Sequence, residues 1–226
     1  IIHLAGKAHD LRNVSNPEEY YISNTDLTKE IYDQFLESDC KVFIMMSSIK
    51  VLGEKFDKII TENIKPNPKT HYGKSKLLAE GYIQSRKIPK NKRFFILRPS
   101  IVYGSGNKGN LIQLFNIFSK INFWPLGLYK NNRSMCSVIN LAFIIEEIIK
   151  NSSIKSGIYN VCDDDTISTN ELIKIISEAL NKKITILNIP KSIIKLISLI
   201  GDKLFLPINN DRLQKLTQNF VMSNSK

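Results

Sequence analysis

Short unbroken apolar runs alternate with longer amphipathic stretches along the first half of the chain. Residues 42–46 and 94–97 are continuous apolar runs, and residues 1–4 have the character of the end of a third. Short runs without polar alternation are typical of strands buried on both faces of a parallel sheet. Residues 25–38 and 72–86 instead repeat apolar side chains at helical spacing. This alternation predicts βαβ units and an α/β fold with a doubly wound parallel sheet.

The pattern changes at Gly104, where a loop begins. Further along, Ser168 and Glu171 have the spacing of a helix-capping box. Residues 1–104 form one predicted domain, and residues 105–226 form mainly a smaller α+β lobe, with some elements that return to the first domain. In this second half we expect helices over 110–121, 139–150, 169–180 and 191–205, a turn over 124–127, and strands over 158–161 and 184–188.

The chain of 226 residues is strongly basic, with 32 lysines and arginines against 21 aspartates and glutamates and a formal net charge of +11. The lysines are scattered among isoleucines and asparagines rather than gathered in a basic stripe with interleaved aromatic residues. We therefore expect no nucleic-acid partner. No run of about 18 apolar residues occurs in the sequence, so we also expect no membrane span.

Cysteines and histidines are few and dispersed. An odd number of cysteines without a CxxC pair argues against a disulfide framework and indicates a reducing compartment. The first residues also lack the features of a signal peptide, so we expect a cytoplasmic protein without a metal site. The residues concerned are Cys40, Cys136, Cys162, His3, His9 and His71.

Tyr72 and Lys76 form a YxxxK motif at the start of a predicted helix. A spacing of four places both side chains on one face of the helix, where an ammonium lowers the pKa of a phenol from its reference of about 10. A tyrosine altered in this way is a competent general acid and base for the interconversion of an alcohol and a ketone. The alternative is an ordinary pair on a helix surface, because both residue types are common.

Ser48 directly follows the predicted strand at 42–46 and lies upstream of Tyr72. A hydroxyl at the carboxyl end of a strand lies where α/β sheets bind ligands. Read singly, however, a serine pair also favours a turn or a helix N-cap.

Five segments, in their order and spacing, resemble the extended short-chain dehydrogenase/reductases, in particular the NAD-dependent epimerase/dehydratase group that acts on nucleotide sugars. The resemblance covers nearly the whole chain and implies a Rossmann-like first domain and a substrate-binding lobe. The segments are His3-Leu4-Ala5-Gly6, Ser47 to Gly53, Tyr72 to Glu80, Leu97 to Gly104, and Asn132-Arg133-Ser134 before Val138 to Ala142.

The resemblance implies a role for each catalytic candidate. Tyr72 would be the acid and base, Lys76 would hold the nicotinamide ribose and tune Tyr72, and Ser48 would hydrogen-bond the reacting oxygen. Asn24 is similar to the helix asparagine that lies near the site in this family. Its alternative is a helix N-cap.

The cofactor implied by the resemblance is NAD or NADP. Ala5 and Gly6 would line its ribose–phosphate side, and the segment that contains Pro99, Ile101 and Val102 would run beside the nicotinamide. The first βαβ unit of the family, with its glycine-rich phosphate turn, has no counterpart in the sequence, so we expect an N-terminally truncated form that holds the cofactor poorly. A GxGxxG-like stretch at 104–109 follows the catalytic helix and is rejected because of that position.

The expected substrate is a UDP-sugar. Arg133 is similar to the arginine that grips the diphosphate, because a guanidinium makes forked bonds to phosphate oxygens; its alternative is a solvated loop arginine. Arg212 is a candidate second phosphate ligand. Ser100 stands where some relatives carry asparagine. Asn110 fits the loop that covers uracil and sugar, with a helix N-cap as its alternative.

The implied function is NAD(P)-dependent oxidation and reduction at C4 of a UDP-hexose in surface polysaccharide biosynthesis. A UDP-sugar 4-epimerase and a UDP-4-keto-6-deoxy-N-acetylhexosamine 4-reductase both remain open. A dehydratase is disfavoured because Ile49 and Lys50, rather than an acidic pair, follow Ser48. The alternative is a non-catalytic truncated remnant that retains a nucleotide-sugar lobe but cannot hold the dinucleotide. Relatives also suggest a homodimer formed through the helices at 25–38 and 72–86.

Overall fold

The computed structural model describes residues 1–8, 16–106, 110–203 and 209–226, with only the backbone for Asn110, Lys203 and Asp211. Its contacts divide the chain into two compact units. The first, here called the sheet unit, comprises Ile1–Gly104, Cys136–Asp163 and Met222–Lys226. The second, here called the lobe unit, comprises Ser105–Met135 and Asp164–Val221.

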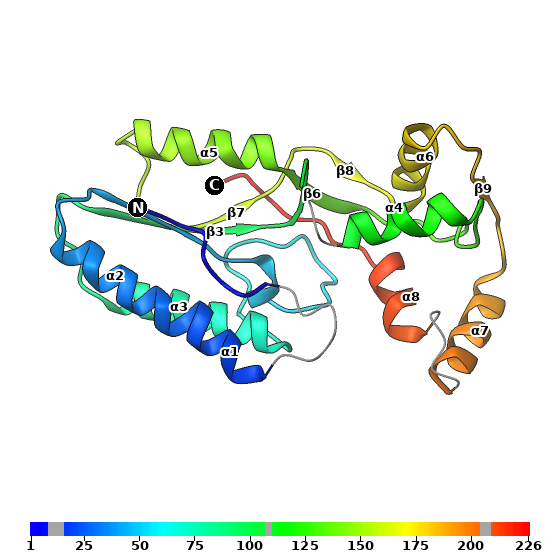
Figure 1. Cartoon of the computed structure of the whole chain (residues 1–226), viewed down its shortest axis with the longest axis horizontal. Helices are drawn as coiled ribbons and strands as arrows, with labels where there is room; N and C mark the ends of the chain where they lie inside the picture. Colours follow the sequence, from blue (N-terminus) through cyan, green and yellow to red (C-terminus); the bar gives the residue numbers. More distant parts are fainter. Residues whose placement is uncertain (9–15, 107–109, 204–208) are drawn as a thin grey trace. The chain divides into compact units, whose positions relative to one another are not determined.

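A four-stranded parallel sheet forms the centre of the sheet unit (Figure 1). Its strands are β1 (Ile2–His3), β2 (Val42–Met46), β3 (Arg93–Pro99) and β7 (Gly157–Val161), in the order β1-β2-β3-β7. Ile44 of β2 lies opposite Ile2 of β1 and Phe95 of β3, which sets the register. The predicted parallel α/β fold is therefore confirmed.

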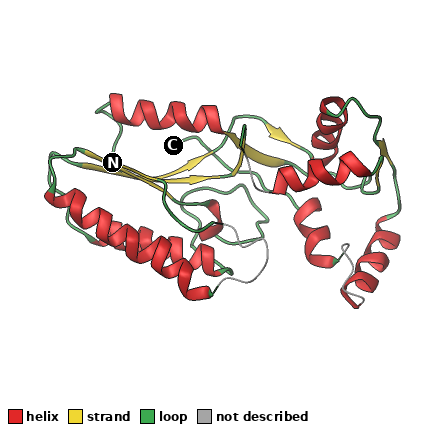
Figure 2. Cartoon of the chain, viewed as in Figure 1, coloured by secondary structure: helices red, strands yellow, loops and turns green. Residues whose placement is uncertain are grey.

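Helices cover both faces of this sheet (Figure 2). On one face lie α1 (Pro17–Tyr21), α2 (Leu27–Glu37) and α3 (His71–Ser85), and on the other lies α5 (Val138–Lys150). A π-helical turn, η1 (Ile22–Asp26), joins α1 to α2, and a short 3₁₀ helix, η2 (Ile49–Val51), follows β2. The two long helices on the first face match the helical spacing of the sequence.

The two faces explain why the apolar runs are unbroken. Phe43 and Met45 of β2 pack against the α2 and α3 face, whereas Ile44 between them packs against the α5 face. Successive side chains of a strand point to opposite faces, so both sets must be apolar when both faces are covered. All three side chains are fully buried, and each such burial contributes about 1.5–3 kcal/mol.

Two strands that the sequence pattern did not indicate follow β3. They are β4 (Ile101–Tyr103) and β6 (Arg133–Ser137). The backbone of β6 pairs with β8 (Thr166–Ile167), with Arg133 opposite Ile167. Arg133 also forms a bridge with Phe220. The segment around Arg133, expected as a loop, is thus a strand, because its partners are distant in sequence and provide the backbone hydrogen bonds.

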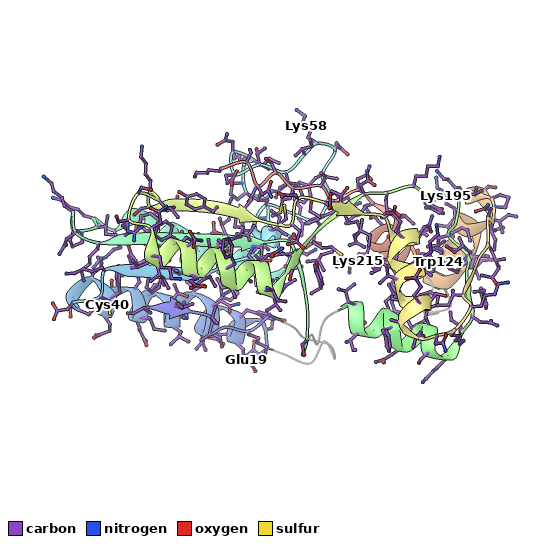
Figure 3. The ribbon with its side chains drawn as sticks, turned by 90° about the horizontal axis from the view of Figure 1, so that it is seen from above. Glu19, Cys40, Lys58, Trp124, Lys195 and Lys215 are labelled. Atoms are coloured by element: carbon purple, nitrogen blue, oxygen red, sulfur yellow. The ribbon has the colours of Figure 1, made fainter. Side chains whose placement is uncertain are left out.

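The lobe unit is built around its own apolar core, in which Trp124 (Figure 3) packs with Phe118, Ile173 and Ile194. Ser168 and Glu171 form the predicted capping box. Trp124, expected in a turn, belongs to a short strand and donates through Nε1 to Asn170. The elements of this unit are α4 (Asn110–Lys120), α6 (Thr169–Ala179), α7 (Lys191–Lys203), α8 (Asn210–Thr217), β5 (Phe123–Trp124) and β9 (Thr185–Ile186).

None of the helices within the described ranges is long and apolar enough to cross a membrane. The same residues contain no group of three or more histidine, cysteine, aspartate or glutamate side chains that could hold a metal ion. His9, one of the three histidines, lies outside the described residues.

Candidate active site

Three predicted site segments follow the carboxyl ends of three parallel strands. Gly6 comes after β1, Ser48 after β2, and Ser100 directly after β3. Because parallel strands end at the same edge of their sheet, these residues lie along one edge, which is where α/β sheets bind ligands. Helix α3 adds Tyr72 and Lys76 from its first turns.

Helix α3 begins where the sequence predicts, because a capping residue precedes it. Thr70 is its N-cap, and the Thr70 hydroxyl accepts a hydrogen bond from the Gly73 N–H at 3.1 Å. Gly73 is required by close packing: a Cβ there would lie 2.6 Å from the carbonyl oxygen of Lys50 in η2. The absence of a side chain at Gly73 therefore lets the loop that carries Ser48 approach the helix.

Lys76 is buried, with only 4 % of its surface exposed. Its Nζ donates a hydrogen bond of 2.9 Å to the carbonyl oxygen of Met46, the last residue of β2. Burial lowers the pKa of Lys76 to about 8, and the Glu80 carboxylate one turn further along acts in the opposite direction. The alternative of an ordinary surface pair is thus wrong for this lysine.

Ser48 and Tyr72 are joined by a side-chain hydrogen bond, which lowers the pKa of the phenol. Burial raises that pKa by more, so that it lies above its ordinary value. The expected lowering of the Tyr72 pKa by Lys76 is therefore wrong in this structure; the lysine Nζ is instead bound to Met46. Ser48 is also the N-cap of η2, accepting from the N–H of Lys50, so the N-cap interpretation is confirmed, and the predicted role of Ser48 at the site stays a prediction.

Gly6 lies against the buried lysine. Its φ is +155°, and a Cβ there would come within 2.5 Å of Asn24 Oδ1 and 3.0 Å of Lys76 Nζ. Only a glycine fits this close approach of the backbone. Ala5, its neighbour and the second predicted cofactor residue of this segment, is exposed.

Asn24 is fully buried within η1. Its side chain accepts from the N–H of Lys7 at 2.8 Å and donates to the carbonyl oxygen of Lys7 at 2.9 Å. It also donates to the hydroxyl of Ser75 on α3 at 3.0 Å. The N-cap alternative is wrong, because Asn24 lies inside η1. Its side chain ties the segment after β1 to helix α3. π-Helical turns are frequent at functional sites.

The segment after β3 contains the remaining predicted cofactor residues. Pro99 is the last residue of β3 and is buried, whereas Ile101 and Val102 of β4 are half-buried. Ser100 is 8 % exposed, and its buried hydroxyl has no hydrogen-bond partner among the described residues. A buried hydroxyl without a protein partner is suited to bind a ligand.

Sequence reasoning assigned no role to several buried polar residues beside this site. His3 accepts or donates a hydrogen bond of 2.8 Å with the Thr28 hydroxyl, and burial together with the charge of Lys76 lowers its pKa. Glu80 and Arg98 form a buried ion pair. His3, Glu80 and Arg98 all lie within segments that carry the family resemblance, which is the signal that could have identified them.

The predicted diphosphate ligands belong to the lobe unit. Arg133 is half-buried, burial lowers its pKa, and its Nε is buried without a hydrogen-bond partner among the described residues. A solvated loop arginine is therefore excluded, and a buried guanidinium N–H is suited to an anion. Arg212 lies exposed in the first turn of α8, where its N–H donates to the N-cap Asn209. Asn110 begins α4, but its side chain lies outside the described residues.

The chemistry of the sheet-unit site follows from these groups. A hydrogen-bonded serine and tyrosine can share a proton with an alcohol or carbonyl oxygen. Lys76 uses one of its three donors on Met46, which leaves donors for ribose hydroxyls. The backbone also approaches closely at Gly6, and the Ser100 hydroxyl has no hydrogen-bond partner in the described part of the chain. With these features, the site fits the nicotinamide–ribose end of a dinucleotide.

Comparisons with known proteins identify the family of the chain. A family model described as the NAD dependent epimerase/dehydratase family matches residues 1–162. The chain is 30% identical over 193 residues, 84% of its length, to an N-acetyl-α-D-glucosaminyl-diphospho-ditrans,octacis-undecaprenol 4-epimerase of Escherichia coli O157:H7. It is 32% identical over 195 residues, 84% of its length, to a UDP-glucose 4-epimerase of Vibrio cholerae.

Solved structures show the same fold. The UDP-glucuronic acid 4-epimerase from Bacillus cereus, crystallised with NAD, matches with a TM-score of 0.68 and 20% identity, over 82% of this chain and 60% of that one. The chain spans 57% and 60% of the lengths of the two curated relatives. Because the family model matches most of the sequence, the chain belongs to the NAD dependent epimerase/dehydratase family.

Proposed function

We propose that this chain carries the catalytic and sugar-binding part of an enzyme that oxidises and reduces C4 of a UDP-hexose with NAD or NADP. The single observation that carries the proposal is the hydrogen-bonded pair of Ser48 and Tyr72, positioned with buried Lys76 at the ligand-binding edge of the sheet. The two curated relatives, both named as 4-epimerases, support reaction at C4.

In the proposed mechanism Tyr72 moves a proton at the C4 oxygen. The nicotinamide, when bound, supplies the chemistry of accepting and donating hydride at C4. Ser48 hydrogen-bonds the C4 oxygen and keeps it in line with the phenol. Because burial raises the Tyr72 pKa, the phenol is protonated at neutral pH and is ready to donate a proton to a C4 ketone.

Ligand binding is divided among the other predicted residues. Lys76 would hold the nicotinamide ribose, and Ala5 and Gly6 would lie along the ribose–phosphate side. The segment of Pro99, Ile101 and Val102 would flank the nicotinamide, and Ser100 would offer its hydroxyl to the sugar. For the substrate, Arg133 would bind the diphosphate, with Arg212 as a second phosphate ligand and Asn110 beside the uracil and sugar.

Two outcomes of this chemistry compete. The relatives' names favour a 4-epimerase. The raised pKa of Tyr72 favours a 4-keto reductase, because reduction begins with a protonated acid. A 4,6-dehydratase is not supported, because Lys50 after the catalytic serine pairs with Glu54 and offers no acid–base pair for elimination.

The proposal is tested by incubating the purified protein with NAD or NADPH and three sugars: a UDP-hexose, a UDP-4-keto sugar, and a polyprenyl-diphospho-N-acetylglucosamine. Mass spectrometry and NMR of the products distinguish the outcomes. A change of configuration at C4 without net oxidation indicates epimerase, and a gain of two hydrogens indicates reductase. No product from any sugar would favour the non-catalytic alternative.

A further inference from the structure

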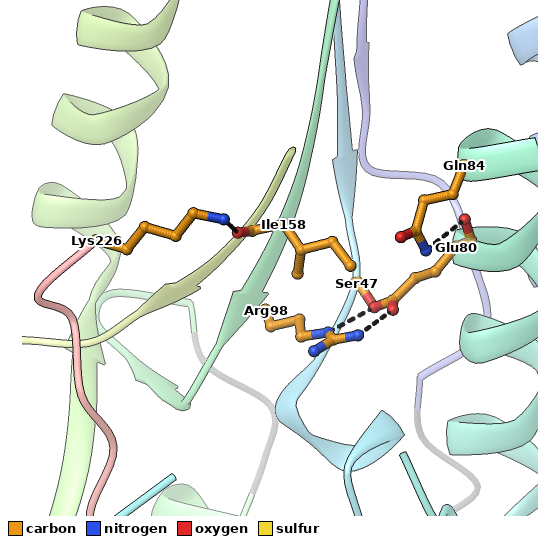
Figure 4. A network of polar contacts seen from close by, with 6 residues as sticks. All are labelled: Ser47, Glu80, Gln84, Arg98, Ile158 and Lys226. Atoms are coloured by element: carbon orange, nitrogen blue, oxygen red, sulfur yellow. Dashed lines mark hydrogen bonds and ion pairs between the residues drawn. The ribbon is translucent and has the colours of Figure 1, made fainter. Parts of the chain in front are cut away.

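A buried polar network connects the three segments that form the candidate site (Figure 4). The Glu80 carboxylate of α3 accepts from Arg98 of β3 through both oxygens, at 3.0 Å from Nε and 2.5 Å from Nη2. The hydroxyl of Ser47 donates to the same carboxylate at 2.5 Å. All three side chains are at most 2 % exposed, so the contacts are shielded from water and salt.

Each member of this network is next to a predicted site residue. Ser47 immediately precedes Ser48, and Arg98 immediately precedes Pro99 and Ser100. Glu80 lies one helical turn beyond Lys76 on α3. The Glu80 carboxylate therefore joins three segments: the loop that carries Ser47 and Ser48, the end of β3, and helix α3. All three groups are shielded from solvent.

The carboxylate also acts on the charge of Lys76. Burial disfavours the Lys76 ammonium and brings the pKa to about 8, while Glu80 raises it. Further titratable groups on these elements of the described chain include His3 of β1, whose pKa the charge of Lys76 lowers, Tyr72 of the same helix, and Arg98 of β3, which is paired with Glu80. His3 and Tyr72 are neutral when buried at neutral pH, because burial lowers the pKa of the first and raises that of the second. Glu80 is thus the anion that favours the charged lysine.

We propose that Glu80 is a positioning residue of the candidate active site: it holds the Ser47–Ser48 loop and the end of β3 against helix α3, and it places a carboxylate one helical turn from Lys76. Removing Arg98 or Glu80 alone leaves a buried unpaired charge, which is strongly destabilising. A neutral replacement of both partners is tolerated much better. This contrast separates a role in positioning from a role in stability.

The first test measures the pKa of Lys76 directly and does not depend on any enzyme activity. The ¹³Cε resonance of Lys76 is titrated by NMR in the labelled chain and assigned with Lys76→Arg. We expect a pKa near 8 in the wild type and a value lower by about one pH unit or more in Glu80→Gln. Glu80→Asp, which keeps the charge but shortens the side chain, retains the wild-type value. An unchanged pKa in Glu80→Gln overturns the proposal.

The double variant Glu80→Gln/Arg98→Met is the control for the case in which Glu80→Gln alone does not fold. It is neutral at both positions, and we expect its melting temperature to lie near that of the wild type while its Lys76 pKa stays lowered. If the double variant regains the wild-type Lys76 pKa, the network is only a stabilising ion pair and the proposal is wrong.

The second test rests on the proposed function and uses steady-state kinetics. Ser47→Ala removes the contact between the serine loop and Glu80, so kcat falls about 10- to 100-fold, as for a small misplacement of a catalytic group, with little change in the KM for the UDP-sugar. In the double variant the alkaline limb of the kcat profile moves to lower pH, because Lys76 loses its proton earlier. Unchanged kcat in Ser47→Ala contradicts the positioning role. An inactive wild type contradicts the proposed function alone, because the NMR titration still tests Glu80.

Discussion

Burial and hydrogen bonding change the pKa of Tyr72 in opposite directions. The bond from Ser48 favours the phenolate, but the loss of hydration disfavours it more. Lys76 is itself poorly hydrated and donates to Met46. A lysine one turn away in sequence is therefore not enough to make a tyrosine acidic.

Tyr72→Phe tests this role at the level of a single atom. The variant keeps the ring and loses the hydroxyl, so we expect turnover to fall at least about 100-fold, the lower end for loss of a general acid and base. Tyr82→Phe on the same helix is the matched control. Its hydroxyl donates to Asp33 near the surface, so turnover stays near that of the wild type. Similar activities for the two variants would remove Tyr72 from the mechanism.

Arg133→Ala tests the proposed diphosphate ligand. Charge-assisted hydrogen bonds to phosphate contribute roughly 1.5–3 kcal/mol each. Because the diphosphate is bound in both ground and transition states, we expect KM for the UDP-sugar to rise at least about tenfold while kcat changes less. Arg133→Lys recovers only part of the loss, since an ammonium lacks the planar fork.

The control for Arg133 is Arg86→Ala, which removes a largely exposed arginine that pairs with Asp33 in the sheet unit. Its KM should equal that of the wild type. Inhibition by UDP is measured for each variant. If Arg133→Ala retains both its KM and its inhibition by UDP, the phosphate ligand must be sought elsewhere, first at Arg212.

At the level of elements, the packing of α3 against η2 depends on one glycine. Gly73→Ala would bring a Cβ to 2.6 Å from the Lys50 carbonyl and 2.9 Å from Pro68, so the helix and the serine loop must separate. We expect a lower melting temperature and a lower kcat, because Ser48 moves away from Tyr72. Circular dichroism and steady-state kinetics measure the two effects.

Gly81→Ala is the matched substitution on the same helix. A Cβ at Gly81 meets nothing within 4 Å, so the change should stabilise the protein by about 0.5–1 kcal/mol through the better helix propensity of alanine. Activity should be unchanged. A Gly73→Ala protein that behaves like Gly81→Ala would show that the close approach to η2 is not required.

At the level of the whole molecule, cofactor binding by the 226-residue chain is expected to be weak. The glycine-rich phosphate turn of the family has no counterpart in its sequence, and backbone N–H groups at such a turn contribute much of the affinity for a pyrophosphate. Calorimetry with NAD and with NADP should give dissociation constants well above the micromolar range. Micromolar affinity would mean that another segment of the chain binds the pyrophosphate.

Much of the fold was predictable because the relevant signals are local. The unbroken apolar runs of β2 and β3 reflect coverage of both faces of the sheet, and the capping box at Ser168 is set by residues three positions apart. The spacing of Tyr72 and Lys76 likewise follows from helix geometry alone. A candidate site could therefore be proposed from the sequence before any contact was known.

Sequence alone determined that this protein has a parallel α/β sheet, a helix that presents Tyr72 and Lys76, and membership of a recognisable family. The tertiary structure decided the protonation of Tyr72 and Lys76 and the hydrogen-bond partners of the site residues. Three features depend on residues that are far apart in sequence: the burial of Tyr72, the two hydrogen bonds between Asn24 and Lys7, and the strand that contains Arg133. The physical reason is that hydration and backbone pairing are properties of the packed chain, whereas periodicity reports only on neighbours along it.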